Sequence, residues 1–166
     1  MDGRRRQFPR YYFTSESDLL DILSNGSTPE KIMKHTSKIY LNCKVLSLDK
    51  NERTADDRPY ATEFIAGVGT ENVSFEPRVP LDGKVEIYQQ TILDAMKTTL
   101  FNNLTRSIVR YVSMDRDSWL MHKKPDNESF RPGEDSSDPA QIILITLAIY
   151  YVNEVEEVFA KFAKGM

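Results

Sequence analysis

The chain has 166 residues, of which 40% are hydrophobic and 28% are charged, and its formal net charge is -3. This length suits one soluble domain or two small subdomains, and the weakly acidic balance excludes a dedicated nucleic-acid binder. The single cysteine, Cys43, excludes an intrachain disulfide. The longest apolar stretch, residues 142–152, is too short to span a bilayer, so we expect no membrane partner.

The N-terminal segment combines a basic cluster with an aromatic run. Four arginines lie within the first ten residues, and we interpret them as a solvated tail, with a phosphate or acidic-partner contact as the alternative. The run that follows contains a proline and three consecutive aromatic residues, which favour a half-buried strand. We therefore expect this run to form a structural anchor, through Phe8, Pro9, Arg10 and Phe13.

A short helix is predicted directly after the aromatic run. Ser15 followed three residues later by Asp18 is an acidic variant of the capping box. Leucine and isoleucine then recur at helical spacing, and the Asn25-Gly26 pair predicts the end of this helix.

A second helix is predicted from about Pro29 to Cys43. Thr28 can cap it, and a proline at the first helical position is favourable. His35 lies beside the apolar face of this helix. Because no second ligand lies nearby in the sequence, we interpret His35 as a packed or surface histidine rather than a metal ligand.

Residues 44–82 change from helical to extended character. Residues 45–48 suggest a short extended piece, and the charged residues 50–59 predict a loop. Beyond them, residues 61–68 form a strand candidate, turn residues follow, and residues 73–76 alternate with a period of two. These features predict a β-hairpin of roughly 61 to 77, whose second strand is an edge strand because it ends in prolines.

Two long helices are predicted in the rest of the chain. Apolar residues recur at steps of three and four from about Val85 to Val112, which predicts one sustained buried stripe. Trp119, the only tryptophan, is expected to dock between helices. Residues 123–138 are polar and predict a surface loop. The last helix, from 138 to 162, is apolar nearly all round in its first half, so we expect it to be central.

These elements predict a mainly α fold of the α+β class. The expected architecture is a helical bundle segment with long amphipathic helices and a small β-hairpin near 61–77. We expect a single unit over residues 1–166, with two small subdomains, 1–43 and 44–166, as the alternative.

Several motifs, in order, resemble the linker region of dynein heavy chains. They are Phe-Pro-Arg-aromatic-Tyr-Phe with its acidic helix, Met-x-x-Thr-Leu, Arg-x-x-Trp and Pro-x-Gln, at residues 8–24, 96–100, 116–119 and 139–141. The resemblance covers most of residues 4–160 and corresponds to the C-terminal half of the linker, shortly before the first AAA+ module. It implies further structural anchors at Met96, Trp119 and Gln141. The hairpin turn and the polar residues 123–138 depart from the family pattern.

The resemblance implies a mechanical function. A linker is a lever that ATP hydrolysis in the neighbouring AAA+ modules remodels to drive motility along microtubules. The implied partners are the AAA+ ring of the same heavy chain and, through the parent motor alone, microtubules. The implied localisation is cytoplasmic and cytoskeletal. Because the hairpin turn and residues 123–138 depart from the family pattern, we favour an axonemal or protist-type chain in a cilium or flagellum.

We expect no catalytic, cofactor-binding or metal-binding residues in this chain. Its two histidines, His35 and His122, are far apart in sequence, and it has neither a glycine-rich phosphate loop nor a Walker lysine motif. ATP and Mg would therefore belong to the parent motor, and this chain would be a fragment of it without enzyme activity.

Two alternatives to the linker remain open. One is a stand-alone helical scaffold that binds a partner helix, and a weaker one is an enzyme domain, which ATP turnover by the chain itself would favour. The amount of exposed apolar surface distinguishes the linker from the stand-alone scaffold. A linker fragment exposes a broad apolar patch, whereas a self-sufficient module covers its apolar faces.

Overall fold

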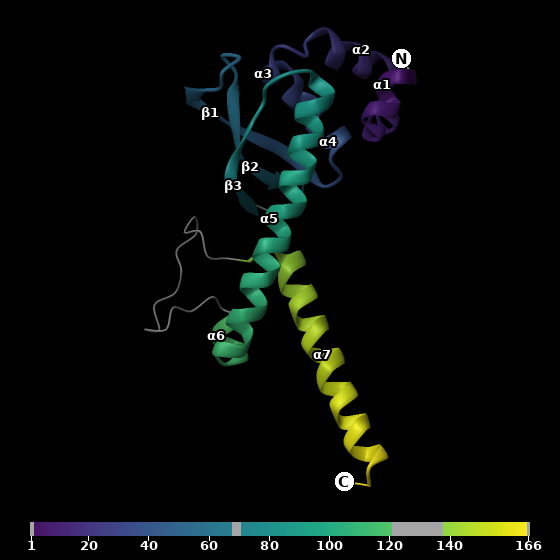
Figure 1. Ribbon diagram of the computed structural model, residues 1–166, viewed down its shortest axis with the longest axis vertical. Coiled ribbons are helices and arrows are strands. Elements are labelled where there is room, and N and C mark those ends of the chain that lie inside the picture. Colours follow the sequence, from purple (N-terminus) through teal and green to yellow (C-terminus); the bar gives the residue numbers. More distant parts are fainter. Residues whose placement is uncertain (1, 68–70, 121–137, 166) are drawn as a thin grey trace. The chain divides into compact units, whose positions relative to one another are not determined.

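The structure is a computed structural model that describes residues 2–67, 71–120 and 138–165. The chain forms two compact units, Met1–Thr99 and Leu100–Met166. Helix α5, Val85–Ser113, is the one described element that contributes to both units (Figure 1). The alternative subdomain boundary between residues 43 and 44 lies inside the first unit.

The first unit begins with short helical segments. They are α1 (Asp2–Gln7), η1 (Pro9–Phe13), α2 (Glu16–Ser24), α3 (Pro29–Ile32), η2 (Met33–His35) and α4 (Thr36–Ile39). The expected strand in the aromatic run is wrong, because these residues form the 3-10 helix η1. Pro9 is the first residue of η1, where its fixed φ suits a helix and its missing N–H costs nothing.

The helix expected from Pro29 to Cys43 is shorter and is interrupted by the 3-10 turn η2. It ends at Ile39, because Tyr40 is extended and Asn42 has a φ of 59°, in the left-handed region that asparagine tolerates. Cys43, the expected end of that helix, is buried and lies instead at the start of a strand.

A three-stranded antiparallel sheet follows, in the order β1-β2-β3 (Figure 1). Its strands are β1 (Cys43–Arg53), β2 (Pro59–Ala66) and β3 (Asn72–Pro80). The expectation of a helical bundle with one small hairpin near 61–77 is therefore wrong. The hairpin is the β2–β3 part of a larger sheet, and its turn lies partly outside the described residues.

The missed strand is β1, whose charged second half predicted a loop. Arg78 on β3 donates to Asp49 and Glu52 of β1, at 2.7 Å each, and its guanidinium lies 5.5 Å from the ring centroid of Tyr60 on β2. Cross-sheet ion pairs of this kind let a charged run occupy an edge strand, where charged side chains also discourage pairing with other chains.

One core joins the short helices, the sheet and the first half of α5. Its members are apolar side chains that are almost completely buried. They come from the short helices, from the sheet and from α5. They include Phe8, Tyr11, Leu19, Ile22, Ile39, Leu46, Ala61, Phe75, Val79, Leu81, Tyr88, Ile92 and Met96. The first unit thus has a closed apolar core of its own, although some apolar side chains at its surface, such as Phe13 and Leu41, stay exposed.

The second unit consists of the C-terminal part of α5, the short helix α6 (Arg116–Leu120) and α7 (Ala140–Ala163). Both long helices are confirmed. The expected central position of the last helix is wrong, because Ile142 and Thr146 are the two residues of α7 that are buried. The surface loop predicted at 123–138 lies outside the described residues, except for Asp138. None of the described helices is both long and apolar enough to cross a membrane.

Candidate functional site

The aromatic run packs the N-terminal segment against the rest of the first unit. Phe8 and Tyr11 are fully buried, and their rings meet edge to face with centroids 4.9 Å apart. Arg10 donates to the backbone carbonyl of Ile39 at 3.1 Å, and its guanidinium lies 6.0 Å from the ring centroid of Tyr40. The run therefore attaches η1 to α4 by both apolar and polar contacts.

Two members of the expected anchor do not act as core residues. The side chain of Phe13 is 73% exposed, and Pro9 is also exposed. A strand would place residues 11 and 13 on one face, but in the tighter 3-10 helix Tyr11 turns inward and Phe13 turns outward. The expectation that Phe13 is a buried anchor is wrong for that reason.

Two long-range polar contacts attach the N-terminal segments to the start of α5. Arg4 donates to Glu86 at 2.5 Å, and the Glu86 side chain is 5% exposed. The Tyr40 hydroxyl donates to Gln89, through its side-chain and its backbone carbonyl. Because buried carboxylates and amides cost free energy when unpaired, these contacts fix where α5 begins.

A charged network joins α2 to the segment around η2. His35 is buried, with its Nε2 2.7 Å from Asp21 and its Nδ1 3.4 Å from Asp18. Lys38 donates to both Asp18 oxygens. Hydrogen bonding from Lys38, and then from Ser15, lowers the pKa of Asp18 to about 2. His35 is a packed histidine, as predicted.

The turn between β3 and α5 is held by residues that sequence reasoning missed. Arg58 donates to the carbonyls of Leu81 and Gly83, at 3.1 and 2.6 Å, and Asp56 accepts from the Gly83 N–H at 2.9 Å. Gly83 has a φ of 78°, which glycine adopts without strain. These contacts, which we call the turn clasp, come from the β1–β2 connection. Only the three-dimensional pairing of the two loops reveals them.

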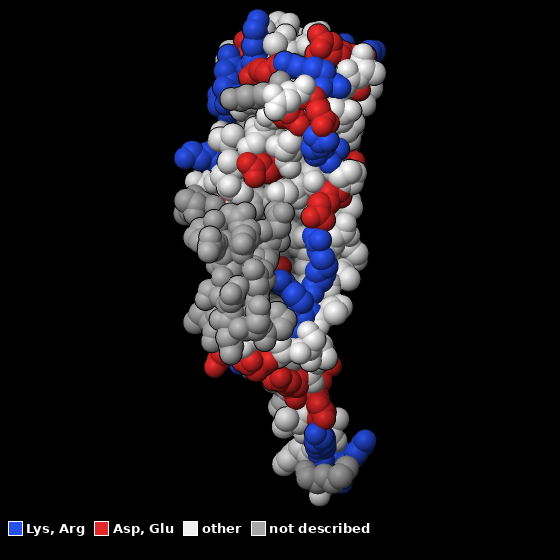
Figure 2. Space-filling model, turned by 90° about the vertical axis from the view of Figure 1, so that its left-hand side faces the viewer, with Lys and Arg blue, Asp and Glu red and all other residues white. Residues whose placement is uncertain are grey.

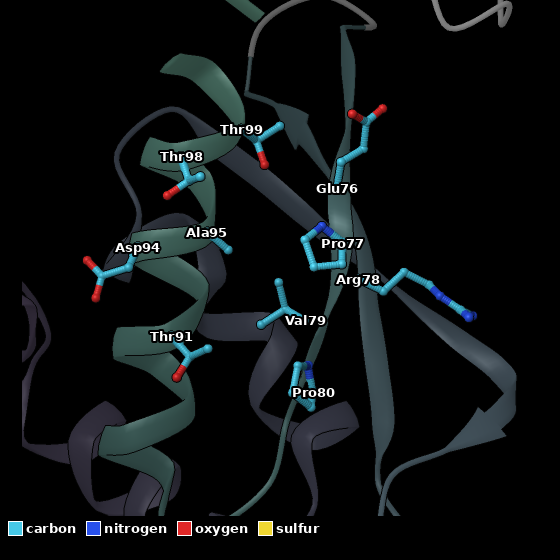
Figure 3. A pocket seen from close by; sticks show the side chains of 10 residues that line it. All are labelled: Glu76, Pro77, Arg78, Val79, Pro80, Thr91, Asp94, Ala95, Thr98 and Thr99. Atoms are coloured by element: carbon cyan, nitrogen blue, oxygen red, sulfur yellow. The ribbon is translucent and has the colours of Figure 1, made fainter. Parts of the chain in front are cut away.

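An open groove of about 380 Å³ lies between edge strand β3 and α5 (Figure 3). Pro77, Val79 and Pro80 form one wall. The other wall comes from α5 and includes Ala95 and Thr98, while Arg78 points away from the helix. The lining is mainly apolar, and its polar groups are the threonine hydroxyls and the Asp94 carboxylate on α5, with Glu76 and Arg78 on β3. Arg78 is the one cation among the described residues that line the groove, so the groove has no cluster of cations for phosphate.

The anchors expected beyond residue 90 have different surroundings. Met96 and Trp119 are buried, and the indole of Trp119 meets the ring of Tyr111 edge to face, with centroids 5.0 Å apart. Gln141 is exposed in the first turn of α7, so it does not anchor that helix. Asp138 does not cap that helix either. Pro139 is the N-cap, and Asp138 pairs with Arg110 of α5.

Charged side chains of both signs are interspersed over the first unit, on the face that Figure 2 shows. That face carries no large field of one sign, in keeping with the expected absence of a nucleic-acid partner, which stays a prediction. In the described parts of the chain, no group of three or more His, Cys, Asp or Glu side chains could hold a metal ion.

Comparison with known families identifies the chain. Residues 1–107 match the family model described as "Dynein heavy chain, N-terminal region 2". The chain belongs to the dynein heavy chain family. The matched residues include the aromatic run, the sheet, the turn clasp and most of α5, so the dynein family model covers the whole first unit.

Curated dynein heavy chains align with almost the whole chain. The alpha chain of the flagellar outer arm from Chlamydomonas reinhardtii is 37% identical over 99% of this chain. A ciliary dynein beta chain from Tripneustes gratilla is 30% identical, and human dynein axonemal heavy chain 9 is 31% identical, each over 99% of this chain. The chain spans about 3% of the length of each of these three relatives.

The relatives also bear on the expected localisation. They are axonemal, ciliary and flagellar dyneins, so they support the cytoskeletal, axonemal localisation that the sequence implied. Because α6 and α7 align with these dyneins beyond the family match, both units of the chain have counterparts in axonemal heavy chains.

Proposed function

We propose that the chain is part of the linker of an axonemal dynein heavy chain, a lever that ATP hydrolysis in adjacent AAA+ modules remodels to drive motility along microtubules. The observation that carries this proposal is the alignment of 99% of the chain with axonemal heavy chains. Its proposed partners are the AAA+ ring of the same heavy chain and, through the parent motor alone, microtubules.

The contacts of the first unit suit a part that bears load. A lever must transmit force without deforming locally, which requires side chains that interlock at native density. The short helices are joined to α5 through Arg4 with Glu86 and Tyr40 with Gln89, and the turn clasp holds the strand-to-helix turn. Each of these contacts bridges at least 23 residues of sequence, so they resist local unfolding together.

The stand-alone scaffold is the second candidate function. A self-sufficient scaffold covers its apolar faces, but Phe101 and Val109 of α5 and many residues of α7 are exposed. Surface of this kind favours a segment of a larger protein. We therefore prefer the linker.

The central test is mechanical and uses the intact motor. Trp119→Ala removes the buried indole that packs on Tyr111, and we expect it to slow microtubule gliding much more than it reduces basal ATP hydrolysis. Leu41→Ala is the matched control, because Leu41 is 92% exposed. Unchanged gliding, or a parallel loss of gliding and basal hydrolysis, would contradict a lever role for this packing.

We also propose that the chain carries no catalytic or nucleotide site and that ATP and Mg bind elsewhere in the parent motor. The 166-residue chain should neither hydrolyse ATP nor change its melting temperature when Mg-ATP is added, because a bound ligand stabilises the folded state. Turnover that survives purification and depends on protein concentration would refute this proposal.

A further inference from the structure

Helix α7 has a second apolar face, which we call the α7 stripe. It consists of Leu144, Ala148, Tyr151, Val155, Val158 and Phe162, at alternating steps of four and three residues. This spacing aligns the side chains along one side of a helix. Leu144, Tyr151, Val158 and Phe162 are the large exposed members, and the exposed fraction of each exceeds 60%.

The α7 stripe lies away from the face that packs on α5. On the packed face, the Thr146 hydroxyl donates to Ser107 at 3.3 Å and the Tyr150 hydroxyl donates to the Ile108 carbonyl at 3.2 Å. A helix turns about 100° per residue, so Tyr151 points about 140° away from Thr146. This arrangement explains why the sequence of α7 is apolar nearly all round although one face alone is covered.

The spacing of the α7 stripe selects the kind of partner that fits. Alternating steps of three and four are the pattern by which one helix packs along another. The stripe extends over residues 144–162, about 27 Å at the rise of an α-helix. Ile145, Val152 and Phe159 widen it on one side and Glu154 borders it on the other. The complementary partner is an amphipathic helix with an apolar face and a basic residue opposite Glu154.

We propose that a helix from elsewhere in the same heavy chain packs along the α7 stripe. This inference rests on the proposed function. The relatives that align with 99% of this chain are so much longer that it spans about 3% of each, so one polypeptide supplies many candidate helices. A helix tethered in the same chain binds at high effective concentration, whereas a second copy must arrive by diffusion.

The test is site-specific photo-crosslinking in the full-length heavy chain. Benzoylphenylalanine replaces Tyr151 or Val158 in the stripe, and Asn153, which is exposed on the other side of α7, is the matched control position. We expect crosslinks from positions 151 and 158 to a helix of the same heavy chain, and none from position 153. Crosslinks to another polypeptide or to a second copy, or no excess over the control position, would overturn the proposal.

A second measurement tests whether the α7 stripe is covered by another part of the heavy chain or is needed for the stability of the 166-residue chain itself. Tyr151→Ser should leave the melting temperature of the 166-residue chain unchanged but make the full-length heavy chain more sensitive to proteolysis near α7. An equal loss in both proteins would overturn the proposal, since the side chain would then already be needed within this chain.

The two proposals fail in different ways. If the crosslinks form but Trp119→Ala leaves gliding unchanged, the lever proposal fails and the helix contact stands. If the crosslinks are absent while Trp119→Ala uncouples gliding from hydrolysis, the helix contact alone fails.

Discussion

The two units of the chain differ in how completely they cover their apolar side chains. In the first unit, helices and sheet close around one core that includes Phe8, Leu81 and Ile92 at 0% exposure. In the second unit, α7 buries Ile142 and Thr146, and large apolar residues such as Phe159 stay exposed. The first unit therefore has a core closed by its own contacts, whereas the exposed stripe of the second is the surface along which we propose that a further helix packs.

The largest expected effect tests this contrast with three phenylalanines. Phe8→Ala should lower the free energy of unfolding by about 3–5 kcal/mol, because it empties a fully buried position beside Tyr11. Phe13→Ala in the first unit and Phe159→Ala in the second should each change it by less than about 0.5 kcal/mol, since both side chains are exposed. Urea denaturation measures all three. A large loss for Phe159→Ala would break the contrast.

A smaller effect is expected for the link between the N-terminus and α5. Arg4→Ala should cost about 1–3 kcal/mol, because it leaves the buried carboxylate of Glu86 without its cation. The double variant Arg4→Ala with Glu86→Gln should recover part of that loss. Arg6→Ala is the control, since Arg6 pairs with Asp2 at an exposed site. Equal losses for Arg4→Ala and Arg6→Ala would mean that the link does not hold α5.

The helix cap should matter less. Ser15 accepts from the Asp18 backbone N–H at 3.2 Å, and Ser15→Ala should cost about 1 kcal/mol of stability in chemical denaturation. Ser37→Ala, at an exposed position in α4, should cost clearly less. If the two variants unfold at the same denaturant concentration, the cap contributes nothing measurable.

The smallest effect concerns acid. Hydrogen bonds from Lys38 and then Ser15 lower the pKa of Asp18 from 3.8 to about 2, so its stabilising contribution is present above about pH 4. The contribution is lost as the pH falls toward 2 and the carboxylate is protonated. Lys38→Met should therefore reduce the acid-induced drop in melting temperature, and Lys44→Met at an exposed site should not. An identical pH profile for Lys38→Met and the parent chain would exclude this network as the cause.

Local signals in the sequence predicted local structure well. The Ser15 cap, the stop at Asn25-Gly26 and the long helix α5 each depend on residues within a few turns of one another, and all are present. The predicted buried stripe of α5 holds for its first half, from Val85 to Met96, whereas Val112 is exposed. The resemblance of the aromatic run led to the correct family, because that inference needs the order of motifs rather than their conformation.

The features that were missed depend on partners distant in sequence. Strand β1 contains a charged run that becomes a strand because Arg78 reaches it across the sheet, and Arg58 holds a turn that lies 23 residues away. Neither partner is visible in a local window. Phe13 was misplaced because aromatic residues favour strands in general, while Pro9 here begins a 3-10 helix. The groove beside β3 was likewise not predictable, since it needs the final position of α5.

The position of the unit boundary inside α5 has a practical consequence for preparing either unit alone. A cut between Thr99 and Leu100 would divide a 29-residue helix. It would create two new helix ends, each with backbone groups that have lost their hydrogen-bonding partners. Truncated proteins meant to isolate the first unit should therefore keep α5 to Ser113, where the helix ends. Such proteins would also contain the part of α5 that belongs to the second unit.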